Sequence, residues 1–167
     1  MSITQVLSFK TNSDTKLIDA RGPRFGAAIT TLVLTAFLVT GFAPLLYWQL
    51  AVFTLATFVG LQSSPYGFIY SKLIKPRLKG DVPTEDIRPP HFAQFVGFLF
   101  AASGTVAYLL GADLVGFIII SFALAAAFLN AAFNFCLGCE VYLLIARAKS
   151  SITSRSNRED SYNLPAL

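Results

Sequence analysis

The sequence predicts an all-α, polytopic membrane protein with four transmembrane helices arranged as two repeated helical hairpins. Three observations predict this fold class. The 167 residues are 54% hydrophobic and only 13% charged, whereas a soluble domain carries about 25% charged residues. Two long segments are almost free of charged residues, and the same short motif precedes each of them. The composition therefore excludes an ordinary soluble enzyme and a disordered chain.

The first apolar segment, Phe25–Ser71, contains no Asp, Glu, Lys or Arg. A membrane span needs about 20 residues, so the segment is too long for one helix and fits two helices joined by a tight turn. We expect the turn at residues 41–44, where a glycine and a proline lie close together, because proline disrupts a helix interior. The predicted helices cover residues 24–41 and 45–62.

The second apolar segment, Phe92–Ile145, is interrupted only by Asp113 and Glu140. Its sequence predicts one helix near 92–110, a turn near Asp113 and a further helix that begins near 114. The segment is continuously apolar, whereas the strands of a membrane β-barrel alternate. In lipid, a helix satisfies its own backbone hydrogen bonds, which also favours helices here.

The basic residues predict how the helices are oriented. All 13 Lys and Arg residues precede the first helix, lie between the second and third, or follow the fourth. The two short turns contain none of them. By the positive-inside rule, both termini and the long middle loop lie in the cytoplasm. We therefore interpret the net charge of +4 as a result of basic residues that lie on the cytoplasmic side of the membrane. We expect the lipid bilayer as a partner and no nucleic acid.

An internal repeat divides the chain into units. The pattern D-x-R-x-P-x-F occurs at Asp19–Phe25 and again at Asp86–Phe92, each time immediately before an apolar segment. Two helices per unit keep both units in the same orientation, so we expect a pseudo-two-fold axis along the membrane normal. The predicted organisation is a cytoplasmic N-terminal segment, a membrane domain with two repeats and a disordered cytoplasmic tail: 1–18, 19–148 (repeats 19–80 and 86–148) and 149–167.

The repeated motif has the features of a helix entrance. Proline suits the first turn of a helix, and an aspartate favours the positive end of the helix dipole. Arg21 and Arg88 hold the same place in the two copies, and His91 replaces Arg24 of the first copy. These three residues, Arg21, Arg88 and His91, are candidates for binding an anion or anchoring the helices at the membrane interface. The alternative is helix capping without a ligand.

The two cysteines of the chain, Cys136 and Cys139, form a C-x-x-C pattern followed directly by Glu140. This spacing is used for reversible dithiol chemistry and for half of many metal sites. A helix break near Asn134 would place the pair at the start of a new helix, where amide donors favour a thiolate. A continuous helix would bury the thiols instead. The predicted cytoplasmic location favours a reduced pair over a permanent bridge.

Three segments carry a resemblance to a known family: Asp19–Phe25, Arg88–Gln94 and Phe135–Tyr142, which contains F-C-L-G-C-E. Together they resemble a bacterial membrane-protein family catalogued as a domain of unknown function, over residues 15–148. The resemblance implies a four-helix fold in the bacterial plasma membrane. Members of that family can be encoded beside thioredoxin-like or rhodanese-like proteins, which implies a partner of that kind and the handling of thiols or sulfane sulfur.

Three functions remain open at this point, and so does the question of whether the chain is an enzyme. In the first, Cys136 or Cys139 attacks a disulfide or persulfide of a partner, Glu140 assists proton transfer, and Arg21, Arg88 and His91 supply positive potential. In the second, the chain is a non-enzymatic membrane component, such as a small transporter unit or an accessory subunit. In the third, Cys136, Cys139 and His91 handle Cu(I) or Zn(II).

Inert packing of the two cysteines is the remaining alternative to these functions. The sequence predicts no resident cofactor and no resident metal. A homo-oligomer is expected, because four short helices alone enclose little space.

Overall fold

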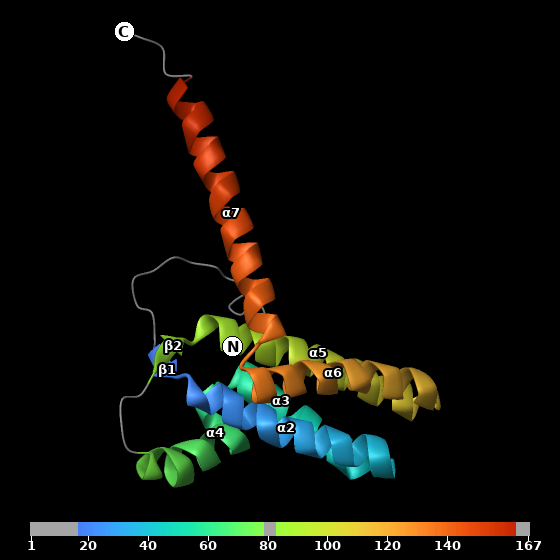
Figure 1. The fold of residues 1–167 in the computed structure, drawn as a ribbon. Helices are drawn as coiled ribbons and strands as arrows, with labels where there is room; N and C mark the ends of the chain where they lie inside the picture. The colour runs from blue at the N-terminus through green and yellow to red at the C-terminus, as the bar shows by residue number, and fades with distance from the viewer. Residues whose placement is uncertain (1–16, 79–82, 163–167) are drawn as a thin grey trace.

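The structure is a computed structural model that describes residues 17–78 and 83–162, with side chains described as far as Lys149. Four of the five long helices pack together in a bundle, and the fifth leaves one end of the bundle across their direction (Figure 1). The all-α class is thereby confirmed. The long helices are α2 (Arg21–Thr40), α3 (Ala43–Phe58), α5 (Arg88–Leu109), α6 (Asp113–Phe133) and α7 (Leu137–Tyr162).

The two tight turns lie where the sequence predicts them. Helix α2 ends at Gly41, whose left-handed backbone (φ 65°) lets its N–H donate to the carbonyl of Phe37 at 2.8 Å. Helix α3 then begins with Pro44 in its first turn, where a proline costs no hydrogen bond. Gly111, also left-handed (φ 75°), joins α5 to α6. Glycine tolerates this conformation without a steric penalty, so both turns follow from local sequence.

Helix α3 is shorter than predicted, because it ends at Phe58 and not near residue 62. Gly60 (φ 129°) turns the chain, and several short helical pieces fold back beneath α2 and α3. The π-helical turn Tyr70–Ile74 packs its first residue, Tyr70, against the ring of Phe25 with ring centroids 5.8 Å apart. The short pieces are η1 (Leu61–Ser63), α4 (Pro65–Ile69), η2 (Tyr70–Ile74) and η3 (Lys75–Arg77).

Packing in the bundle crosses from one half of the chain to the other. Helix α2 contacts α6, and α3 contacts α5, in addition to the contacts of α2 with α3 and of α5 with α6. The buried centre contains Phe37, which stacks on Phe117 with centroids 5.7 Å apart, and Ile120, which lies against Gly104. The outer faces of the helices carry many exposed large apolar side chains, among them Leu32, Val39 and Leu114.

Three helices of the described residues are long and apolar enough to cross a membrane: α2, α5 and α6. Helix α3 is apolar but has only 16 residues, about 24 Å at 1.5 Å per residue. The hydrocarbon core of a bilayer is about 30 Å thick. The three long helices and their exposed apolar faces indicate an integral membrane protein.

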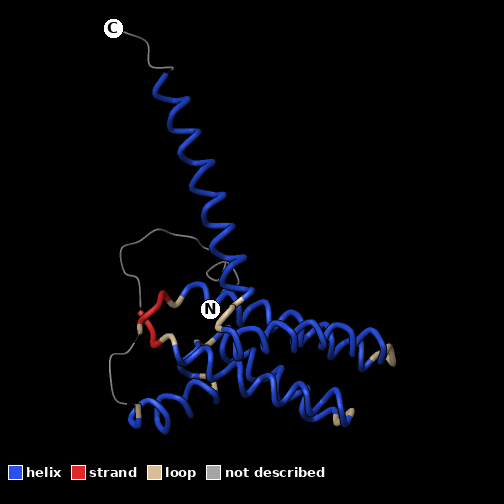
Figure 2. Tube along the Cα trace, viewed as in Figure 1, coloured by secondary structure: helices blue, strands red, loops and turns tan. Residues whose placement is uncertain are grey.

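A two-stranded antiparallel ribbon joins the two copies of the repeated motif, and the sequence did not predict it. Strand β1 (Leu17–Asp19) pairs with β2 (Thr84–Asp86), with Ile18 opposite Glu85. Figure 2 shows the ribbon in red at the end of the bundle from which α7 leaves. The ribbon therefore holds the starts of α2 and α5 together.

Helix α7 continues to Tyr162, into the tail 149–167 for which the sequence favours disorder. The predicted N-terminal segment lies mostly outside the described residues, as do residues 163–167.

Candidate functional site

The cysteine pair lies at a break between two helices. Helix α6 ends at Asn134, which adopts the left-handed conformation (φ 57°), and α7 begins at Leu137. Of the two arrangements that the sequence leaves open, a break near Asn134 and a continuous helix, the structure has the break, and asparagine is among the residues that tolerate this conformation. Cys136 and Cys139 are joined by a disulfide, whereas the sequence favours a reduced pair.

The first turn of α7 directs backbone amides at Cys136. The amide of Cys139 donates to Cys136 Sγ at 3.3 Å, and the amide of Glu140 donates to the Cys136 carbonyl at 3.0 Å. Amide donors at a helix start stabilise a negative charge beside them. In the reduced form of the pair, this arrangement favours a thiolate on Cys136 over one on Cys139.

Gly138, between the two cysteines, lets α7 approach α5 closely. A Cβ at this position would lie 2.7 Å from both Cα and Cβ of Ala93, so a larger residue would push the helices apart. One turn further on, Tyr142 packs on Phe92 with ring centroids 5.8 Å apart. The start of α7, and with it the cysteine pair, is thus held against the start of α5.

Both cysteines are partly buried and line a pocket of about 330 Å³. Its wall combines residues from α2, β2, α5, α6 and α7. Arg24 contributes a positive charge, and its Nε donates to the carbonyl of Ala131 at 3.1 Å. The polar residues of the wall are Arg24, Glu85, Asp86, Gln94, Asn130, Asn134 and Glu140. Glu85 is half-buried there, and its burial, together with the charge of Asp19, raises the pKa of its carboxyl.

Of the predicted site residues, the structure brings Cys136, Cys139 and Glu140 together in this pocket. Arg21, Arg88 and His91 do not line it. The amides of Arg21 and Arg88 instead bind Asp19 Oδ1 and Asp86 Oδ1, each at 3.0 Å. These matching bonds give the repeated motif the same local structure before both helices, although the N-cap residues themselves, Ala20 and Ile87, make no side-chain cap bond.

The side chain of His91 lies beside α3, where its Nε2 is 2.8 Å from the carbonyl oxygen of Thr57. The site hypothesis that combines His91 with Cys136 and Cys139 around a metal therefore has no support in this geometry. Among the described residues, no group of three or more His, Cys, Asp and Glu side chains is arranged to hold a metal ion. Arg24, and not His91, provides the basic group beside the cysteine pair.

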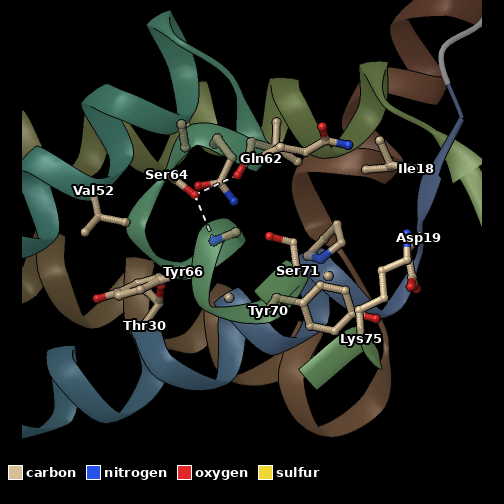
Figure 3. Close-up of a pocket in the computed structure, with 17 residues that line it drawn as sticks. Ile18, Asp19, Thr30, Val52, Gln62, Ser64, Tyr66, Tyr70, Ser71 and Lys75 are labelled. Carbon is tan, nitrogen blue, oxygen red and sulfur yellow. Dashed lines mark hydrogen bonds between the residues drawn. The ribbon is translucent and has the colours of Figure 1, made fainter. Parts of the chain in front are cut away.

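A second, larger cavity of about 410 Å³ was not predicted from the sequence. It lies between α2, α3 and the short helices that follow α3, and Figure 3 shows its lining residues. Ser64 begins α4, and its Oγ accepts a hydrogen bond from the amide of Gly67 at 3.2 Å. The charged residues of the wall are Asp19 and Lys75. Only the fold-back of the chain after α3 brings these residues together, so no local pattern could have revealed the cavity.

The inner end of this cavity meets a buried polar network. Gln49 has no exposed surface, and its Nε2 donates to Thr30 Oγ1 at 3.1 Å. Its Oε1 accepts from the Tyr66 hydroxyl at 3.0 Å, and Tyr66 in turn accepts from Trp48 Nε1 at 3.1 Å. Burial raises the pKa of Tyr66, so the phenol stays neutral. Thr30 and Tyr66 also line the cavity, which therefore reaches the polar centre of the bundle.

The fold and the cysteine pocket define the class of protein. It is a helical protein with a C-x-x-C pair at the end of the bundle, and three helices of its described residues are long and apolar enough to cross a membrane. The chain belongs to the family described as a domain of unknown function, DUF4395, whose model matches residues 18–147. The resemblance to a family of unknown function is thereby confirmed. No curated protein and no solved structure matches the chain.

Proposed function

We propose that this chain is a four-span membrane protein that exchanges thiols and disulfides through Cys136 and Cys139. The observation that carries the proposal is the position of the pair. It lies at the start of α7, with an amide directed at Cys136 Sγ, on the wall of a polar pocket that also contains Arg24. A reactive cysteine differs from an inert one in two properties: its thiolate is stabilised, and its sulfur can be reached by a reaction partner.

The exchange begins from the reduced pair and a partner that holds a disulfide. The Cys136 thiolate attacks one sulfur of the partner, the partner's S–S bond breaks, and its other sulfur leaves as a thiolate. Cys139 then loses its proton and attacks Cys136 Sγ, which releases the second partner sulfur and closes the Cys136–Cys139 bond. Two electrons pass from the pair to the partner. Glu140, exposed on the pocket rim, accepts the Cys139 proton.

The partner of this exchange is a thioredoxin-like protein, or a rhodanese-like protein if the sulfur is transferred from a persulfide. Either one brings its reactive sulfur to the pocket from outside the bundle. The pocket is lined by residues of β2 and of the start of α7, and both of these elements lie at the same end of the bundle (Figure 1). Basic residues gather near this end, among them Lys72, Lys75 and Arg147, which supports a cytoplasmic location for the pocket.

The proposed membrane arrangement has α2, α3, α5 and α6 as spans in two repeated hairpins. Equivalent contacts in the two halves support it. Asp19 and Asp86 accept matching 3.0 Å bonds from the first amides of α2 and α5. The Phe25–Tyr70 and Phe92–Tyr142 ring pairs both have centroids 5.8 Å apart.

The break after each hairpin adds to this equivalence. Ser64 Oγ accepts from Gly67, and Cys136 Sγ accepts from Cys139. The short helix α3 spans by local thinning of the bilayer. Helix α7, whose start carries exposed apolar residues such as Leu144, lies along the interface.

One observation favours a second candidate function, a small transporter unit. The breaks after α3 and α6 occur at corresponding places in the two halves, and each lies beside a pocket. Paired discontinuous helices around a binding site are typical of secondary transporters. This function depends on the cavities and not on the thiols, so replacement of both cysteines by serine would leave it intact.

Trapping a mixed disulfide tests the thiol function. Purified, reduced protein in lipid nanodiscs is exposed to glutathione disulfide and analysed by intact mass. In the Cys139→Ser variant, Cys136 attacks but the adduct is not resolved, so we expect one glutathione per chain, removable by dithiothreitol. The wild type should instead return to its internal disulfide.

The matched control is Cys136→Ser, which retains one cysteine in the same pocket and should acquire the adduct at least tenfold more slowly. Equal rates in the two variants would show that the amide contact does not select Cys136. If neither variant forms the adduct, thiol exchange at this pair is excluded.

A further inference from the structure

Arg24 has a guanidinium group that the fold uses only in part. The residue lies in the first turn of α2, and its Nε donates to the carbonyl of Ala131, in the last turn of α6, at 3.1 Å. Among the residues that the structure describes, no hydrogen bond or ion pair involves its two Nη groups. The donors of arginine form a rigid planar fork, so the bond at Nε also holds the Nη groups in place.

The dipoles of the two helices show where this charge is stabilised. A positive charge is unfavourable in the first turn of α2 but favourable at the C-terminal end of α6. The guanidinium is bound at this second place, beside the helix break that begins at Asn134. Arg24 accordingly lines the same pocket as Cys136 and Cys139.

The corresponding contact in the other half of the chain is made without an arginine. His91 takes the place of Arg24 in the second copy of the motif, and its Nε2 lies 2.8 Å from the carbonyl oxygen of Thr57, in the last turn of α3. The break after α3 has Ser64 where the break after α6 has Cys136. Contact with a carbonyl at a helix end therefore does not require a guanidinium, and the guanidinium occurs beside the cysteines.

Three carboxyl groups share the pocket wall, and in the described structure none of them pairs with the guanidinium of Arg24. Asp86 accepts from the Arg88 amide at 3.0 Å and lies 4.0 Å from Arg88 Nε. Burial chiefly raises the pKa of Glu85, so this carboxyl takes up a proton more readily than an exposed one. Glu140 is exposed at the rim. The Nη groups are therefore available to an anion that enters the pocket.

We propose that the cysteine pocket takes a low-molecular-weight thiol that carries a carboxylate, which the Nη groups of Arg24 bind while the sulfur forms a mixed disulfide with Cys136. A guanidinium and a carboxylate match in shape and form paired, charge-assisted hydrogen bonds. The pocket volume of about 330 Å³ lies within the range of small-molecule sites. This inference rests on the proposed thiol function and adds the class of substrate that restores the reduced pair.

The thiol supplies the two electrons that the pair passes to its protein partner. Its thiolate attacks Cys136 Sγ, the Cys136–Cys139 bond breaks, and the electron pair of that bond goes to Cys139 Sγ, which takes a proton from solvent. A second thiolate attacks the sulfur of the bound thiol. The Cys136 thiolate leaves, the pair is reduced, and the two thiol molecules depart as their disulfide. Exchange in the reverse direction passes through the same mixed disulfide, so Arg24 acts in both directions.

The test uses two disulfides that differ only in the carboxylate: dithiodiglycolate and its neutral diamide. Each is mixed with the reduced Cys139→Ser protein in phosphatidylcholine nanodiscs, where Cys136 is the remaining thiol, and the adduct is followed by intact mass. The carboxylate preference is the ratio of the two rates, divided by the same ratio for mercaptoethanol in solution. A change in thiolate reactivity alters both rates alike, so the preference reports the carboxylate contact.

Removal of the guanidinium should lower this preference. In the Cys139→Ser background, we expect Arg24→Gln to reduce it roughly fivefold, which is about 1 kcal/mol, a modest value because the side chain is exposed. Arg24→Lys keeps the charge without the planar fork and should retain only part of the preference. Arg77→Gln is the matched control: Arg77 is exposed and lines neither pocket, so the preference should not change. Circular dichroism checks that each variant keeps its helices.

The inference is overturned if Arg24→Gln keeps the preference of its Cys139→Ser parent, or if Arg24→Lys keeps all of it, since either result shows that no paired contact forms. A parent without any preference also overturns it, and that result is expected if only a protein partner fits the pocket. In each of these cases adducts still form, so the thiol function stands. If neither disulfide reacts with Cys136, the thiol function fails and the inference fails with it.

Discussion

The close approach of α7 to α5 at Gly138 leads to a quantitative prediction for Gly138→Ala. The added Cβ would lie 2.7 Å from Cα and Cβ of Ala93, whereas relaxed carbon atoms are about 3.5–4.0 Å apart. Two helices would therefore have to separate by about 1 Å. Overpacking of this kind costs about 1–3 kcal/mol, and the better helix propensity of alanine returns at most about 1 kcal/mol.

With the middle of the overpacking range, about 2 kcal/mol, and about 0.5–1 kcal/mol returned by alanine, the expected net loss is about 1–1.5 kcal/mol, which corresponds to roughly a 5- to 13-fold shift in the unfolding equilibrium. The measurement is thermal unfolding in detergent, followed by circular dichroism, together with the alkylation rate of the reduced cysteine pair. We expect a lower melting temperature and faster alkylation, because the start of α7 detaches from α5. The double variant with Ala93→Gly should recover only part of the loss, since the Ala93 Cα remains at 2.7 Å.

Gly26→Ala is the matched control for this prediction. A Cβ at Gly26 would have no atom within 4 Å in the described structure, and the residue lies within α2. The substitution should leave stability unchanged or raise it by up to about 1 kcal/mol. A Gly138→Ala protein that melts at or above the wild-type temperature, with unchanged alkylation, would refute the close contact of α7 with α5.

Two further predictions concern the larger cavity and its polar network. Gln49→Leu removes the bonds to Thr30 and Tyr66 and leaves their buried groups short of partners, so it should destabilise the protein by about 1–3 kcal/mol in thermal unfolding; an unchanged melting temperature would contradict the network. Because the pKa of Tyr70 is raised to about 12 in the fold from about 10 when unfolded, its contribution to stability is present below pH 10 and lost as the pH rises toward 12. In ultraviolet titration, Tyr70→Phe should remove the tyrosine that ionises last, and an unchanged titration curve would contradict the raised pKa.

Much of the fold and part of the cysteine site can be predicted from short stretches of the sequence. Glycine and proline at residues 41–44 determine the first turn, and Asn134 adopts the left-handed conformation that ends α6. These features depend on a few neighbouring residues, so the two tight turns can be predicted, and a break before Cys136 is one of the two arrangements that the sequence offers. The position of the pair at a helix start follows from that break.

The remaining features depend on contacts between distant segments. The ribbon pairs Ile18 with Glu85 through strands of only three residues each, which give no periodic pattern. His91 points at Thr57 because α5 packs on α3, a neighbour that its own motif does not reveal. The cavity beside Asp19 and Tyr70 exists only because the chain folds back after Phe58, whereas the sequence predicts a helix to residue 62.

The ribbon formed by β1 and β2 determines which end of the bundle can open. It ties the starts of α2 and α5 together, and the bond from the Ala20 amide to the Pro83 carbonyl at 2.9 Å extends the tie. At the opposite end, the Tyr108 hydroxyl reaches the Gly41 carbonyl at 3.4 Å, a long hydrogen bond. Rotation of one half against the other would thus pivot about the ribbon, spreading the Gly41 and Gly111 turns most while the cysteine end stays nearly still.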